Sequence, residues 1–287
     1  MRLLETLVPK ASQSPTGGGR LQRSLRFRRI GTILAVIPLV FAVEVWSSWI
    51  SDNAVLKERA LAITAGLTSD SARIRIINDW VYHNHGFGKN NQFFVVPALG
   101  PTPVQVLETG GDCGDKSRLV SAMLRELGIQ SGLVMIFSCR DCMPIHTLVE
   151  ARYEGGRMVV DPIWDIDYPA ADGRFLGVRD LAGTSLGRDR LAQLQLQRGT
   201  ADKIRWMPEN EATFDFAKPL NWDKNLVTRF AAYGLSLLGY DPGQLFRPQF
   251  LEDPKLALTL ALLAVAAMIV AANFVVRAIS ELCNKYT

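Results

Sequence analysis

Residues 110 to 128 read GGDCGDKSRLVSAMLRELG, a run that carries the start and end signals of one helix. Asp112 is a good N-cap residue, and Asp115 three positions later can complete a capping box. Apolar residues then recur at helical spacing up to Gly128, a natural residue just after a helix. Cys113 therefore falls on the first helical residue, where unpaired amide N–H groups and the helix dipole favour a thiolate.

A cysteine at this place has two interpretations. It can be a small buried residue with a packing role only, which is common for cysteine. It can also be a nucleophile, because the thiolate is the reactive form of the side chain. The second interpretation requires a base that accepts the thiol proton.

The base that the sequence offers is His146, which lies in the first of two β-rich runs, and Asp161 ends the second run. The runs predict a β-hairpin. A turn at Glu154–Gly155 places Asp161 opposite Leu148, one same-face step from His146, so that the carboxylate can orient the ring. A turn at Gly155–Gly156 leaves Asp161 about 13 Å from His146 along the strand. If His146 and Asp161 act as a pair, the first register is expected, although turn propensity alone favours the second.

Cysteine, histidine and aspartate in this order match a nucleophile, a general base and a group that orients the base. Four stretches together resemble the bacterial transglutaminase-like domain of the papain-like superfamily: ARIRIINDWV at 72–81, GDCGDKS at 111–117, LRELGI at 124–129, and His146 with Asp161-Pro162. The resemblance covers about residues 69 to 165. It implies that Cys113, His146 and Asp161 are the catalytic triad. Leu148 departs from the family, where many relatives have Trp, which affects the expected substrate shape.

The expected fold class is α+β, with a papain/transglutaminase-like core in which the nucleophile helix packs on a small antiparallel sheet. The order of the predicted elements agrees, because helices come first and strands follow. The predicted helices before the nucleophile are 52–66 and 71–83, and the predicted strands are 132–138, 146–153 and 157–163. Beyond them, helices are expected at 188–196 and 224–238. The latter is amphipathic and is expected to pack on the domain rather than lie at a membrane surface.

Two apolar segments are long enough to span a bilayer. Residues 30–50 carry only Glu44 as a charge, with Trp46 and Trp49 at the interface, and residues 256–276 carry no charge. The alternatives are a buried core helix for either segment and a cleaved signal peptide for the first. The long basic region before residue 30 and the absence of a clear cleavage site disfavour the signal peptide.

The flanking charges predict the orientation. Residues 1–29 contain a single acid, Glu5, and seven basic residues: Arg2, Lys10, Arg20, Arg23, Arg26, Arg28 and Arg29. Both termini are therefore expected in the cytoplasm, and the region between the spans outside it, in a periplasm if the cell has one. The expected organisation is a basic tail (1–29), a first span (30–50), a catalytic domain (51–165), a C-terminal helical extension (166–254), a second span (255–277) and a cytoplasmic tail (278–287).

The remaining cysteines allow three interpretations. Cys139 and Cys142 form a C-x-x-C just before His146. A zinc site lacks a fourth ligand at typical spacing, and a redox pair usually opens a helix. A structural disulfide is favoured by an outward-facing compartment. Cys283 lies on the cytoplasmic side and has no assigned role.

These patterns predict a membrane-anchored cysteine peptidase, amidase or transamidase that forms a thioester at Cys113. The expected substrate is a protein or peptide amide in the cell envelope, and no cofactor, metal or nucleic-acid partner is expected. The net charge of +4 and 48% hydrophobic residues argue against a disordered or nucleic-acid-binding protein. The backbone N–H of Cys113 is a candidate oxyanion donor, and a second donor is expected from the loop of residues 86–109. Two alternatives remain: an inactive binding or assembly module of the same fold, and an acyltransferase of the arylamine N-acetyltransferase kind.

Overall fold

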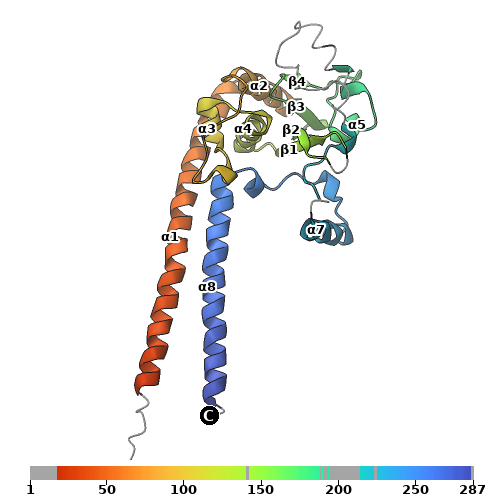
Figure 1. Cartoon of the computed structure of the whole chain (residues 1–287). Coiled ribbons are helices and arrows are strands. Elements are labelled where there is room, and N and C mark those ends of the chain that lie inside the picture. Colours follow the sequence, from red (N-terminus) through yellow and green to blue (C-terminus); the bar gives the residue numbers. More distant parts are fainter. Residues whose placement is uncertain are drawn as a thin grey trace, which may run out of the picture. The chain divides into compact units, whose positions relative to one another are not determined.

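The computed structural model describes residues 18–139, 142–187, 189–190, 193, 214–222 and 225–285. The chain divides into two units, Val45–Leu258 and the terminal segments outside it, and each is described by itself. Figure 1 labels the helices and strands. The α-helices are α1 (Gly18–Ile63), α2 (Asp70–His83), α3 (Pro103–Thr109), α4 (Cys113–Glu126), α5 (Val178–Leu181), α7 (Leu226–Leu237) and α8 (Pro254–Lys285), and the strands are β1 (Ser131–Phe137), β2 (Pro144–Tyr153), β3 (Gly156–Asp161) and β4 (Ile166–Asp167). The short 3-10 helices are η1 (Pro97–Leu99), η3 (Phe214–Phe216), η4 (Pro242–Gln244) and η5 (Gln249–Leu251).

The unit Val45–Leu258 is built on a four-stranded antiparallel sheet in the order β1-β2-β3-β4. α4 packs on β1 and β2, and α2 and α3 pack on α4 (Figure 1). The α+β class, with a helix that carries Cys113 against a small antiparallel sheet, is thereby confirmed. The sequence patterns missed β4, which is only two residues long, and α3, which begins at Pro103.

Alternation along the strands gives the sheet two apolar faces. Val149 and Val160 join the core formed with α2, α3, α4 and the end of α1. Leu148 and Val159 join a second core, formed with the chain that follows β3. His146 and Asp161 share the parity of Leu148 and Val159, so both side chains lie on the side of the second core.

A buried polar cluster ties the entry of α8 to this unit. Glu252 accepts hydrogen bonds from the backbone N–H of Leu133 (2.8 Å) and from Ser121 Oγ on α4 (3.1 Å). Burial raises the pKa of Glu252, whereas these donors and the nearby arginines lower it. Lys255 Nζ lies 2.7 Å from Asp52 Oδ2 on α1. The end of α1 and the start of α8 are thus held on the same unit as the nucleophile helix.

Two helices are long and apolar enough to cross a membrane, over Ile33–Ile63 and Pro254–Leu282. α1 continues without a break into the region where a separate helix, 52–66, was expected. The expected helix at 188–196 lies largely outside the described residues. α7 forms near its expected position, but none of its residues is buried. The expectation that it packs its apolar face on the domain was therefore wrong.

Candidate active site

Cys113 is the first residue of α4, and its position is fixed by a capping box. The backbone N–H of Asp115 donates to Asp112 Oδ1 (3.1 Å), and the N–H of Asp112 donates to Asp115 Oδ2 (3.4 Å). These are the two side chains that the sequence predicted as a capping box. Cys113 has a free thiol and is half-buried, at the positive end of the helix dipole. It packs against the second core, the one that His146 and Asp161 face.

The β2–β3 hairpin brings His146 and Asp161 into contact. The strands pair Tyr153 with Gly156 and Val149 with Val160, so the turn lies at Glu154–Gly155, and the register predicted from a functional pair is confirmed. The ring N–H at His146 Nε2 donates to Asp161 Oδ2 at 2.6 Å. Both side chains are shielded from water, with 1% and 0% exposure.

Asp161 is itself held in one orientation. Its second oxygen, Oδ1, accepts a hydrogen bond from the backbone N–H of Ile163 at 2.9 Å. The ring of Trp164 lies against the imidazole of His146, with centroids 4.6 Å apart and planes tilted by 31°. The carboxylate and the ring are therefore fixed from several sides before any substrate arrives.

The protonation of His146 follows from its neighbours. Burial alone lowers the pKa of His146, but the charge of Asp161, the hydrogen bond to it and the hydrogen bond to Cys113 raise it, to about 10 from 6.5. Asp161 and Cys113 therefore favour the protonated form of the His146 ring. Because Nε2 is used by Asp161, Nδ1 is the ring nitrogen left for Cys113. A cysteine nucleophile requires an adjacent base that takes up the thiol proton, and the His146 ring is the group in that place.

Lys116 is a residue of the site that the sequence patterns missed. It lies one turn after Cys113 and is 2% exposed, and the three N–H donors of Nζ are shared among four carbonyl oxygens at the end of α2: Val81 (2.9 Å), Tyr82 (3.0 Å), Asn84 (3.2 Å) and His85 (3.0 Å). These carbonyls include those that a helix end leaves without intrahelical partners. The sequence signal that could have identified Lys116 is its position on the same helix face as the apolar residues Leu119 and Met123.

The segment held by Lys116 lies beside the nucleophile. Phe87 forms a bridge with Gly111, and Gly88 N–H donates to Gly111 O at 3.3 Å. A Cβ on Gly110 would lie 2.8 Å from Cβ of His85, so only glycine permits this approach. Residues 85–88, which include the start of the stretch 86–109, therefore lie beside Gly110 and Gly111, just before Cys113.

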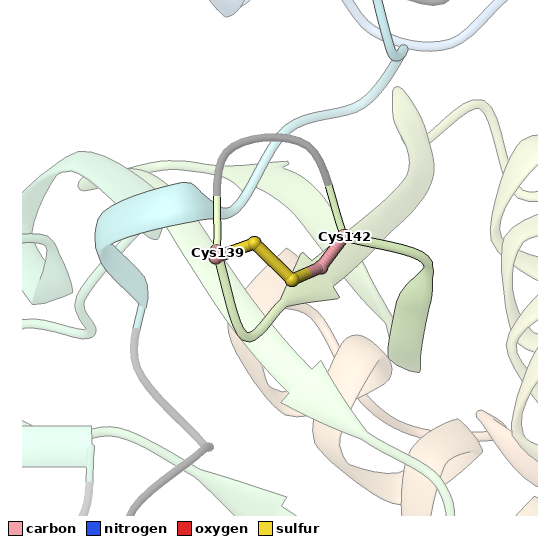
Figure 2. The surroundings of a disulfide bond; sticks show 2 residues. All are labelled: Cys139 and Cys142. Carbon is pink, nitrogen blue, oxygen red and sulfur yellow. A yellow bond between two sulfur atoms is a disulfide. The ribbon is translucent and has the colours of Figure 1, made fainter.

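Cys139 and Cys142 form a disulfide in the turn between β1 and β2 (Figure 2). Neither sulfur is then a thiolate that can bind zinc. Among the described residues, no group of three or more His, Cys, Asp or Glu side chains is placed to hold a metal ion.

Replacing both disulfide cysteines, as Cys139→Ser with Cys142→Ser, is expected to cost no more than about 2 kcal/mol of unfolding free energy, because the closed loop is very short. Urea unfolding of the full chain in detergent, with and without the replacements, measures this. A loss of unfolding free energy above about 4 kcal/mol would contradict a purely local stabilising role of the disulfide.

Comparisons with known proteins match one domain model to part of the chain. Residues 57–162 match the model of the transglutaminase-like superfamily. A comparison with curated proteins found no match. Among solved structures, a proposed cysteine protease from Cytophaga hutchinsonii is 20% identical, with a TM-score of 0.32, over 39% of this chain and 37% of that one. A proposed protease from Parabacteroides distasonis is 16% identical, with a TM-score of 0.29, over 51% of this chain and 30% of that one. The chain spans about a third of each of these structures, so the family match rests on residues 57–162, which contain Cys113, His146 and Asp161.

Proposed function

We propose that this transglutaminase-like protein is a membrane-anchored cysteine acyl-transfer enzyme, a peptidase or amidase that forms a thioester at Cys113. One observation carries the proposal: Cys113 at the start of α4 interacts with the His146 ring, and Nε2 of that ring is held by Asp161. A nucleophile, a base and a group that orients the base are the parts that covalent acyl transfer requires.

The reaction follows from these positions. The Cys113 thiolate attacks an amide or ester carbonyl carbon, and the carbonyl oxygen takes up negative charge. The backbone N–H of Cys113, at the open end of α4, donates to that oxygen, with a second donor from the segment 85–88. His146 gives its proton to the leaving amine as the carbon–nitrogen bond breaks, which leaves a thioester on Cys113. Water, which gives a proton to His146 as it attacks the thioester, then releases the acid and restores the thiolate and the protonated His146.

The location of the site is part of the same proposal. The basic residues before the first span support a cytoplasmic N-terminus, and with two spans residues 51–254 then lie outside. The disulfide Cys139–Cys142 supports this independently, because disulfides persist in oxidising compartments outside the cytosol. In this arrangement residues 51–165 form the catalytic domain, 166–254 its extension, and protein or peptide amides of the cell envelope the substrate class.

The test compares cells that carry the native chain, Cys113→Ala, or Cys283→Ala as a control that removes a cysteine outside the domain. New N-termini in envelope proteins are identified by mass spectrometry, with a biotin-labelled primary amine supplied in parallel. We expect fragments that disappear with Cys113→Ala and remain with Cys283→Ala. Amine incorporation in place of fragments identifies a transamidase. Identical profiles in all three strains would contradict enzymatic activity and favour a binding module.

A further inference from the structure

One face of α7 exposes a continuous apolar surface. Leu226, Phe230, Tyr233 and Leu237 follow one another at spacings of four, three and four residues and are 63–71% exposed, and Val227 and Leu238 extend this face at 77% and 74%. Residues at such spacings share one side of a helix. We call this set of six residues the α7 apolar face. A surface of this kind is rare in a protein that meets only water.

The orientation of α7 is fixed by polar contacts on its other side. Asn225 and Thr228 form a capping box at its start, and Thr228 Oγ1 also donates to the carbonyl of Trp222 at 2.9 Å. Trp222 Nε1 in turn donates to the carbonyl of Pro242 at 3.0 Å. Thr228, Ala232 and Leu235 are half-buried on this inner side. The α7 apolar face therefore points away from the domain because the opposite side is held to it.

Exposed apolar residues continue from α7 to the start of α8. Tyr240 is 57% exposed, and Phe250 and Leu251 are each 42% exposed. Pro254, where the second candidate span begins, follows three residues later. The run of exposed apolar side chains thus leads along the chain directly into a helix that is itself apolar on all sides, as expected for contact with lipid.

We propose that the α7 apolar face lies in the interfacial layer of the same bilayer that the two spans cross. Apolar and tyrosine side chains on one face, with the exposed polar residues Arg229 and Ser236 on its flank, suit a helix lying in the membrane plane. The inference rests on the proposed membrane anchoring and adds a third attachment. With it, α7 attaches the unit that carries the active site to the lipid surface at a further point.

The test uses the full chain in liposomes of phosphatidylethanolamine and phosphatidylglycerol, in a Cys113→Ala and Cys283→Ser background. A maleimide nitroxide is attached at one of three introduced cysteines: F230C on the α7 apolar face, S236C on the polar side of α7 as the matched control, or M268C within the second span. Collision with oxygen, which is enriched in lipid, and with a soluble nickel chelate is measured for each.

We expect oxygen to be favoured at positions 230 and 268, and the nickel chelate at 236, with a severalfold difference in the accessibility ratio between 230 and 236. Equal nickel access at 230 and 236, with 268 in lipid, would overturn the α7 proposal alone. Spin–spin coupling between labels at position 230 of two molecules would also overturn it, because a second copy would then cover this face. Nickel access at 268 would overturn the anchoring itself and the α7 proposal with it.

Discussion

Replacing Asp161 with asparagine is expected to slow acylation of Cys113 about 10,000-fold, with the fold retained. The reason is the tautomer of His146. Asp161 Oδ1 accepts from the Ile163 N–H, and Oδ2 accepts from His146 Nε2. An amide at this position has one acceptor and one donor, so its oxygen is used by Ile163 and its NH₂ faces Nε2. Nε2 must then be unprotonated, so the ring is neutral with its one proton on Nδ1, and it can neither form the imidazolium nor take the proton of Cys113.

The matched control is Asp167→Asn, which removes a carboxylate of the same sheet that contacts Arg75 and Arg190 instead of His146. The rate of Cys113 acylation by an active ester is measured by intact-protein mass spectrometry for both variants. We expect Asp167→Asn to stay within about threefold of the native rate, since it leaves the triad intact. An equal and small effect of both replacements would show that Asp161 does not orient the base.

Replacing Lys116 with methionine is expected to lower the free energy of unfolding by about 3 kcal/mol or more. The four carbonyl oxygens that Lys116 satisfies would lose a charged donor inside the protein, and each charged hydrogen bond is worth about 1.5–3 kcal/mol. Methionine fills a similar volume, so the loss reports the ammonium group and not a cavity. The segment 85–88 would also be released beside Cys113, and acylation is expected to slow.

Lys57→Met is the matched control, because Lys57 is exposed on α1. Urea unfolding of the full chain in detergent, followed by tryptophan fluorescence, compares the two variants. We expect Lys57→Met to change the free energy of unfolding by less than about 0.5 kcal/mol. A Lys116→Met variant as stable as this control would contradict the role assigned to the ammonium group.

The features that sequence patterns predicted are those set by neighbouring residues. The capping box of Asp112 and Asp115 acts within one turn, and it correctly placed Cys113 at the start of α4. The choice between two hairpin turns needed more than local propensity. A Cβ on Gly155 would lie 2.5 Å from the ring of Tyr153, whose hydroxyl accepts from the Phe175 N–H at 3.0 Å. The functional pairing selected the right register, while the contacts that enforce it are distant in sequence.

The features that were missed depend on such distant contacts. The role of Lys116 arises only because the end of α2, more than thirty residues earlier, lies over its side chain. The exposed side of α7 was predicted to be buried, since an amphipathic pattern gives a helix an apolar face without saying what covers it. Glu252 likewise finds its partners, Leu133 and Ser121, on elements far away in the chain.

The most direct test of the account is the alkylation rate of Cys113 by iodoacetamide at pH 5.5 and pH 8.5, in the native chain and in His146→Asn, each with Cys283→Ser. An ordinary thiol, with a pKa near 8.5, loses reactivity several-hundred-fold between these values because its thiolate is protonated. A thiolate paired with the His146 imidazolium is expected to lose less than about tenfold, and His146→Asn to restore the steep dependence. A steep loss in the native chain that His146→Asn leaves unchanged would contradict the assignment of Cys113 as the activated nucleophile.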